Sequence, residues 1–223
     1  MRKKYRLKFS KIDKMKFIGH LDLLKLLQRT INRAKLPIAY SEGFNPHQLV
    51  AFAQPLSLGY ETVGDYFDIV LENELDINFV IKSLNKVMPC GMFVTSGKIY
   101  DQYEKNSAAL LIASDYKISF PLDFNLSDVL KIFNREEILY TKISKKGVEK
   151  VINVKEDIYE IKQLSENVID VKIASGSIKN LKPEIIIEII CKELKVEIDI
   201  NKVHITRLEM YMFDCNEKLI RLN

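Results

Sequence analysis

The chain has few of the residues that build disulfide frameworks and metal clusters. Its 223 residues include three cysteines, Cys90, Cys191 and Cys215, and no two of them form a C-x-x-C pair. This spacing argues against a disulfide framework, a zinc finger or an iron–sulfur cluster held by the chain, and we expect reduced thiols. Glycine and proline are also scarce, with eight and six residues, which argues against long disordered stretches.

Long hydrophobic runs are absent as well. Ile185–Ile187, one of the longest, is bounded by Glu184 and Glu188, and no window approaches the roughly 20 apolar residues of a membrane-spanning helix. The basic start, Met1–Arg6, is followed by alternation and not by the apolar core of a signal peptide. We therefore expect a cytoplasmic protein with no membrane partner. The G-x-G-x-x-G, P-loop and G-x-S-x-G signatures are absent too.

Charge is distributed unevenly along the chain, whose net charge is +4. Residues 1–50 carry 12 Lys and Arg against three Asp and Glu, whereas residues 51–223 carry 22 against 27. A basic N-terminal region on a near-neutral chain indicates a local anionic partner, with nucleic acid first among the classes. A solvated surface whose lysines bind nothing specific explains the same count, so charge alone does not decide.

Hydrophobic periodicity predicts a regular order of elements in residues 1–100. Alternation predicts a strand at 4–12, and three-to-four spacing predicts an amphipathic helix at 19–35 that ends at Leu36-Pro37. The same criteria predict strands at 49–53, 65–71 and 92–100, a turn at 60–63, and a helix that Asp76 caps. The order strand, helix, strand, strand, helix, strand is that of a ferredoxin-like unit.

The second half repeats this order after a polar connector at 101–106. The predicted elements are strands at 109–120, 138–143, 168–174 and 203–213, helices at 125–136 and from 181 or 182 to 194, and a strand or hairpin within 148–164. We therefore predict an α+β protein of tandem ferredoxin-like (βαββαβ) units with antiparallel sheets. The N-terminal domain spans 1–103 and the C-terminal domain 107–223. The duplication rests on element order, because the halves share few identical residues.

The polar side of the helix predicted at 19–35 forms a basic ridge. Its members recur about one turn apart or lie just upstream: Asp22, Lys25, Arg29 and Arg33 on the helix, and Lys14 and Lys16 before it. Cations at this pitch can follow a phosphate backbone. The alternative is an ordinary helix surface on which Asp22 pairs with Lys25.

Two of the three histidines lie where turn residues are concentrated. His20 occupies the first turn of the predicted helix, where the helix dipole favours a neutral imidazole. His47 ends the loop Ser41-Glu42-Gly43-Phe44-Asn45-Pro46-His47, in which glycine permits left-handed backbone and Asn-Pro fixes a turn. Such restriction around an exposed polar residue is typical of a binding loop.

We therefore predict a specific binding site made by this loop and the helix start. Its residues are Glu42, Gly43, Phe44, Asn45 and His47 from the loop, and His20 and Asp22 from the helix. His20 and His47 are also candidate catalytic residues for acid–base chemistry, and a metal site of His20, Asp22 and His47 stays open. A packing or capping role is the alternative for each histidine, and we predict no cofactor.

Several motifs in this order resemble a known family. They are Phe9-Ser10-Lys11, Lys16-Phe17-Ile18-Gly19-His20-Leu21-Asp22, the run Arg33–His47 that ends in "GFNPH", and Ala53-Gln54-Pro55-Leu56-Ser57-Leu58-Gly59. Weaker echoes follow in "SGS" at 175–177, "KPE" at 182–184 and "ITRLEMY" at 205–211. The chain resembles the radical SAM-linked protein family, a domain of unknown function. It departs from the family pattern at Gly19, where we expect a serine N-cap, and at Gln48, where we expect proline.

The resemblance implies an accessory role. Family members are stand-alone partners of, or fusions to, radical SAM proteins that often carry a cobalamin-binding domain, and they are commonly encoded beside ribonuclease and ribosomal-protein genes. This chain has no C-x-x-x-C-x-x-C, so it is not itself the radical SAM catalyst.

We therefore expect an RNA-binding protein, not itself an enzyme, that recruits a substrate for a separate radical SAM enzyme in RNA or ribosome-related modification. Its partners would be RNA and the radical SAM protein. Two alternatives stay open: a metal-independent endoribonuclease that uses His20 for acid–base catalysis, and a pure protein–protein adaptor.

Overall fold

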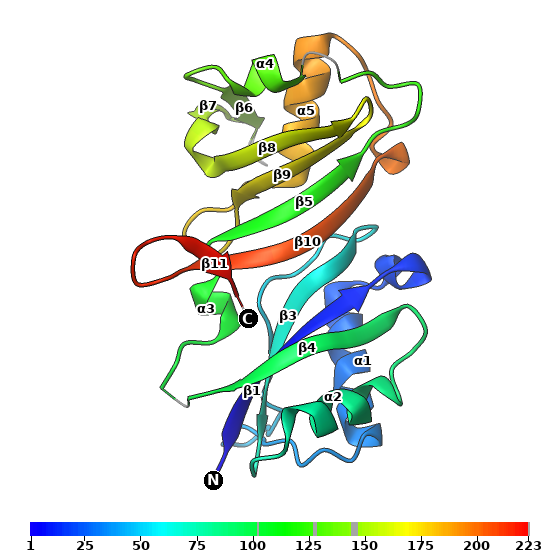
Figure 1. Cartoon of the computed structure of the whole chain (residues 1–223), viewed down its shortest axis with the longest axis vertical. Coiled ribbons are helices and arrows are strands. Elements are labelled where there is room, and N and C mark those ends of the chain that lie inside the picture. The colour runs from blue at the N-terminus through cyan, green and yellow to red at the C-terminus, as the bar shows by residue number, and fades with distance from the viewer. Residues whose placement is uncertain (102, 127–128, 144–146, 223) are drawn as a thin grey trace. The chain divides into compact units, whose positions relative to one another are not determined.

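The chain is an α+β protein in the computed structural model, which describes residues 1–101, 103–126, 129–143 and 147–222 (Figure 1). It divides into two compact units, unit 1 from Met1–Leu111 and Arg207–Asn223, and unit 2 from Ile112–Thr206. The boundary near residue 111 lies just after the polar connector at 101–106. Residues from Arg207 onward pack with unit 1, whereas the sequence assigns them to a second domain, 107–223. The division into domains 1–103 and 107–223 stays a prediction.

Unit 1 follows the order of elements predicted for the first half. Its elements are β1 (Lys3–Lys11), the 3₁₀ helix η1 (Asp13–Phe17), α1 (His20–Arg33), β2 (Val50–Phe52), β3 (Glu61–Leu71), α2 (Ile77–Asn85), β4 (Met92–Tyr100), α3 (Ser107–Leu110), most of β10 (His204–Phe213) and β11 (Leu219–Arg221). β1 pairs antiparallel with both β3 and β4, β2 pairs antiparallel with β3, and β11 pairs antiparallel with β10. The first four strands therefore have the spatial order β4-β1-β3-β2.

Both helices of this half were predicted correctly. α1 buries Leu23, Leu27 and Ile31 along one side, the three-to-four spacing seen in the sequence. α2 begins after Asp76, whose side chain accepts a hydrogen bond from the Phe79 N–H at 2.9 Å.

The main core of unit 1 lies between these two helices and the sheet. α1 and α2 cover the same face of β1, β3 and β4 (Figure 1). On β1 the inward side chains are Tyr5, Leu7 and Phe9, all fully buried, and Val80 and Leu84 of α2 meet them. The period-two alternation of β1 therefore sends its apolar side chains to the helices and Arg6 and Lys8 to the opposite face.

The turn predicted at 60–63 is wrong, because β3 begins at Glu61 and continues through Gly64. A Cβ atom at Gly64 would lie 2.0 Å from the Leu208 carbonyl oxygen on β10. Glycine at this position is therefore needed for close approach of two strands and does not mark a turn.

The strand predicted at 109–120 is also partly wrong. Residues Ser107–Leu110 form the short helix α3, capped by Asn106, and the strand β5 (Ala113–Ser119) follows. Ser107 is buried, and its N–H donates to Asp68 Oδ2 at 2.6 Å. This long-range hydrogen bond holds the start of α3 in place, and the local sequence pattern does not indicate it.

Unit 2 has an antiparallel sheet in the order β5-β9-β8, with β8 at Ile158–Ser165 and β9 at Val168–Ala174. Its helix α5 (Pro183–Leu194) has Pro183 in the first turn, as predicted, and buries Ile186 and Ile190. The remaining elements are α4 (Val129–Phe133), β6 (Leu139–Ile143), β7 (Glu149–Asn153) and the 3₁₀ helices η2 (Lys155–Asp157) and η3 (Ile200–Lys202).

Two predictions in unit 2 need correction. The strand at 138–143 does not join β5 and β9, because β6 pairs with β7 in a separate two-stranded sheet. Of the helix predicted at 125–136, only Val129–Phe133 is helical, and residues 127–128 lie outside the described part of the chain. No helix of the described residues is long and apolar enough to cross a membrane.

We expect Arg6→Met to destabilise unit 1 by about 3–5 kcal/mol, because the change leaves the buried Asp68 carboxylate without the cation that pairs with it. Arg6 is fully buried and its Nε lies 3.3 Å from Asp68 Oδ1. Urea unfolding followed by circular dichroism measures the loss.

Arg2→Met is the matched control, since the Arg2–Glu72 pair lies at the surface, with side chains 46% and 47% exposed. Exposed pairs contribute about 0–1 kcal/mol. Equal losses for the two variants would contradict a structural role for the buried pair.

Candidate nucleic-acid interface

The Lys16 carbonyl group helps to hold the segment before α1 in place. The Lys16 carbonyl accepts hydrogen bonds from Gly59 N–H at 2.9 Å and from Lys11 Nζ at 3.4 Å. Lys11 is buried, and its Nζ also donates to the Tyr60 carbonyl at 3.2 Å. Burial lowers the pKa of Lys11, an effect that the Asp65 carboxylate opposes. These hydrogen bonds join the 3₁₀ helix η1 to the loop before β3. Phe17, the last residue of η1, is thereby held just before the first turn of α1.

The basic ridge borders a hollow of about 870 Å³ on the surface of unit 1. We call it the basic hollow, and its lining residues are Phe17, Ile18, Asp22, Lys25, Leu26, Arg29, Asn32, Arg33 and Pro89. Four of the six predicted ridge residues therefore lie at one site. Lys14 and Lys16 stay outside the lining, and Lys16 lies 3.9 Å from Glu61.

The cations of the basic hollow differ in how far they are already paired. Arg33 donates to the Val87 carbonyl after α2 at 3.1 Å. Lys25 and Arg29 are exposed and make no hydrogen bond or ion pair with any residue that the structure describes. The Asp22–Lys25 pair of the ordinary-surface alternative is not formed, and Asp22 is likewise exposed without a partner among the described residues. Two cations and one carboxylate are therefore available to a ligand.

The predicted binding loop closes on itself. Ser41 Oγ accepts from His47 N–H at 3.1 Å and lies 2.8 Å from His47 Nδ1, and the Ser41 N–H donates to the His47 carbonyl at 2.9 Å. Gly43 has φ = +112°, so glycine is required there. Glu42, Gly43, Phe44, Asn45 and His47 are all exposed, as a binding loop requires. We call Ser41–His47 the Gly43 loop.

The structure does not bring His20 and His47 together. His20, half-buried in the first turn of α1, packs edge-on against Phe52 at 5.4 Å between ring centroids. Gln48, next to His47, donates to Asn32 near the other end of α1 at 2.6 Å. His20 and Asn32 are separated by about 18 Å of helix.

The sheet register gives the same separation. Phe52, the neighbour of His20, packs on Phe9 of β1 at 5.8 Å between ring centroids. Ile38, shortly before the Gly43 loop, pairs with Leu71, which pairs with Lys3 at the opposite end of β1. Lys3 and Phe9 are about 20 Å apart along the strand.

The residues predicted to form one site thus lie on two separate surfaces of unit 1. The basic hollow takes Asp22, Lys25, Arg29 and Arg33, and the Gly43 loop stands at the far end of α1. No group of three or more His, Cys, Asp and Glu side chains within the described ranges has an arrangement that could hold a metal ion, and this applies to His20, Asp22 and His47.

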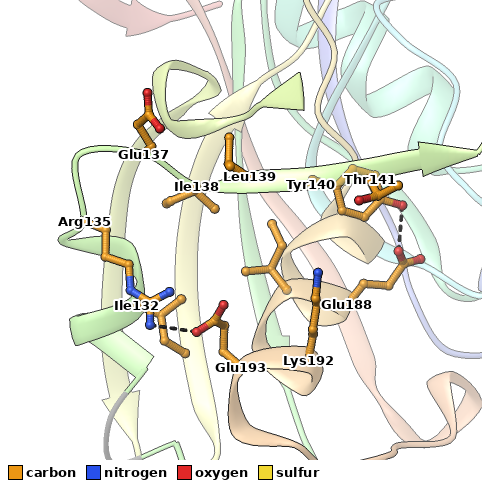
Figure 2. A pocket seen from close by; sticks show the side chains of 11 residues that line it. Ile132, Arg135, Glu137, Ile138, Leu139, Tyr140, Thr141, Glu188, Lys192 and Glu193 are labelled. Carbon is orange, nitrogen blue, oxygen red and sulfur yellow. Dashed lines mark hydrogen bonds and ion pairs between the residues drawn. The ribbon is translucent and has the colours of Figure 1, made fainter. Parts of the chain in front are cut away.

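Unit 2 carries a second hollow, of about 560 Å³, which the sequence did not indicate. Figure 2 shows Tyr140 and Glu188 next to each other at one edge of it, with the Tyr140 hydroxyl donating to Glu188 Oε2 at 2.7 Å. Arg135 pairs with Glu193 at 2.7 Å on the other side (Figure 2). We call this site the Tyr140 hollow.

Its electrostatics do not favour a polyanion. The hydrogen bond to Glu188, with burial, raises the pKa of Tyr140 to about 12, so the phenol stays neutral at pH 7. Arg135 lowers the pKa of Glu193, which stays ionised. Three carboxylates in the lining, from Glu137, Glu188 and Glu193, outnumber two cations, so the basic hollow is the better candidate for a nucleic acid.

Comparison with known proteins identifies the family. Residues 4–183 match the family described as "Uncharacterized protein conserved in bacteria (DUF2344)". The chain belongs to the DUF2344 family. No curated protein matches it. Among solved structures, the crystal structure of an unknown protein from Galdieria sulphuraria is similar over 93% of this chain and 99% of that chain, with 10% identity and a TM-score of 0.29.

The part of the chain that matches the DUF2344 family contains the whole basic hollow and the Gly43 loop. It also contains residues that sequence reasoning did not assign to the site, above all Phe17, Leu26 and Pro89. Phe17 lies inside one of the motifs given above. Its side chain is 65% exposed, which the sequence did not indicate, because an apolar residue is normally expected to be buried. Pro89 reaches the hollow only because the end of α2 packs beside α1.

We expect Gly43→Ala to destabilise the chain by about 1–3 kcal/mol, because a Cβ atom makes φ = +112° a strained conformation. No atom lies within 4 Å of that Cβ, so the effect comes from the backbone and not from a clash. Chemical denaturation measures the change.

Gly19→Ala is the control, since Gly19 has φ = −69° and equally open surroundings. Because Gly19 is the N-cap of α1, where alanine is less favourable than glycine, the change should cost less than about 1 kcal/mol, an effect that the lower entropy of the unfolded chain partly offsets. A Gly43→Ala variant as stable as Gly19→Ala would show that the loop does not need glycine.

Proposed function

We propose that this DUF2344 protein is an accessory RNA-binding protein that recruits a substrate for a separate radical SAM enzyme. One observation carries the RNA part of the proposal: exposed Lys25 and Arg29, without partners among the described residues, lie beside a hollow of about 870 Å³. Cations that are free in the protein can release counterions from a phosphate backbone at no loss of internal ion pairs. They also face solvent from a rigid helix, which keeps their spacing fixed.

The helix geometry supports contact with successive phosphates. Lys25, Arg29 and Arg33 are one turn apart, about 6 Å of helix rise between neighbours. Arg33 keeps donor capacity beyond its bond to the Val87 carbonyl, because a guanidinium carries five N–H donors. A strand of RNA laid along α1 would meet all three.

The fold and partner complete the proposal. The order β4-β1-β3-β2, with β1 antiparallel to both neighbours and helices on one face, supports a ferredoxin-like unit 1. The radical SAM partner rests on the resemblance described above, and the basic hollow supports RNA as the cargo. In this proposal His20 is a packing residue against Phe52 and not an acid or base, so bound RNA should be recovered uncut.

Affinity for a single-stranded RNA oligomer should fall steeply with salt, and Lys25→Glu with Arg29→Glu should flatten that dependence. Each lost phosphate contact reduces the slope of log K against log salt by about 0.7 for a single strand, so the double variant should lose about 1.4. Fluorescence anisotropy between 50 and 300 mM KCl measures both slopes.

Lys150→Glu with Lys202→Glu is the matched control, because both lysines are exposed in unit 2, outside either hollow, and the net charge changes equally. Its slope should equal that of the wild type. A flat salt dependence for the wild type, or equal effects of the two double variants, would refute binding at the basic hollow.

A further inference from the structure

Phe17 has an exposed aromatic side chain although a residue close to it in the same 3₁₀ helix is buried. Its exposed fraction is 65%, whereas Met15, two residues earlier in η1, is buried. The Phe17 ring lines the basic hollow, and the Lys16 ammonium lies over the ring at 5.4 Å from its centroid. An aromatic ring beside free cations is the arrangement with which proteins bind single strands, because bases stack on the ring while cations contact phosphates.

Asp22 is the second feature that a purely electrostatic phosphate site does not need. Its carboxylate lines the same hollow as Phe17, Lys25 and Arg29 and has no partner among the described residues. A carboxylate there weakens attraction for phosphate, so it opposes non-specific binding. An ionised carboxylate can only accept hydrogen bonds, and it offers two oxygens side by side.

The chemistry of the bases selects one partner for such a group. Guanine alone among the four RNA bases presents two adjacent N–H donors, N1–H and the 2-amino group, on its Watson–Crick edge. In a duplex that edge is occupied by cytosine, whereas in a single strand it is free and the base can leave the stack. The hollow, at about 870 Å³, has room for a nucleotide together with its flanking phosphates.

We propose that the basic hollow receives an unpaired guanine of single-stranded RNA, with the base stacked on Phe17 and its Watson–Crick edge on Asp22. Lys25 and Arg29 contact the phosphates on either side of that nucleotide. The inference rests on the proposed function and deepens it, since it states which part of the RNA the site reads. It also assigns opposite roles to neighbouring side chains on α1: Asp22 selects the base, and the cations supply affinity.

Anisotropy with labelled oligouridine decamers that carry one central G, inosine, A or C tests the proposal. The wild type should bind the G oligomer about tenfold more tightly than the A oligomer, the discrimination of one bidentate contact. Inosine lacks the 2-amino group and should lose most of that preference. Pairing the G oligomer with its complement should remove it too.

Two variants separate the contributions. Asp22→Asn should abolish the preference for G over A while the salt slope stays steep, and Phe17→Leu should weaken binding of every oligomer about tenfold or more through lost stacking. Both side chains are exposed, so neither change threatens the fold. Asp123→Asn and Phe79→Leu are the controls, since these exposed residues lie outside the hollow and should leave affinity and preference unchanged.

The outcomes distinguish the two proposals. Equal affinity for all oligomers, or a G preference that survives Asp22→Asn, overturns the guanine assignment while a steep salt slope keeps the proposed function. Equal or tighter binding of the duplex overturns the single-strand assignment in the same way. Absence of binding to every RNA at 50 mM KCl overturns both.

Discussion

The buried charge of Arg6 is the constraint on which unit 1 depends. Its guanidinium has no exposed surface. Asp68 at 3.3 Å supplies the opposite charge, the carbonyls of Lys105 and Leu222 accept hydrogen bonds at 3.0 Å, and the face of Tyr100 lies at 4.7 Å. An uncompensated charge in the interior is strongly unfavourable. β3, the connector after β4 and the end of the chain must therefore all be in place around β1.

Several cations of the basic N-terminal region are bound inside unit 1 and are not available to a partner. Arg6, Lys8 and Lys11 contribute to its positive charge, yet all three are engaged within unit 1: Arg6 with Asp68, Lys8 with Glu209 at 2.7 Å, and Lys11 with backbone carbonyls. The exposed cations of this region that have no partner among the described residues are Lys14, Lys25, Arg29 and Lys35, and of these Lys25 and Arg29 lie at the basic hollow. The charge asymmetry of the sequence is thus partly structural, because several of its cations are bound within unit 1.

The elements that the sequence predicted well are those whose information is local. α1 and α2 follow from helical spacing and the Asp76 cap, and β1 and β4 follow from alternation. The errors concern long-range contacts. Gly64 was assigned to a turn because nothing nearby in the sequence indicates that β10 lies against it. Ala109 and Leu110 were assigned to a strand because the helix that they end is held through Ser107, whose partner Asp68 lies 39 residues away.

The candidate site shows the same division. The pitch of Lys25, Arg29 and Arg33 on one side of α1 was predictable from sequence spacing, and the structure gathers them at the basic hollow. Whether His20 lies near His47 depends on the path of β2 along α1. Residue spacing in the sequence does not determine that path. The exposure of Phe17 depends on the loop that fixes the Lys16 carbonyl, so the aromatic component of the site emerged only in three dimensions.

The return of the chain end to unit 1 has a consequence for synthesis. Arg6 donates to the carbonyl of Leu222, 216 positions later, and the whole of unit 2 is encoded between the two parts of unit 1. On a ribosome, β1 emerges before unit 2, yet Arg6 cannot complete its buried contacts until Leu222 has left the exit tunnel. Unit 2 is continuous in sequence and is synthesised in between, so the contacts of β1 are completed only after the whole of unit 2 has been made.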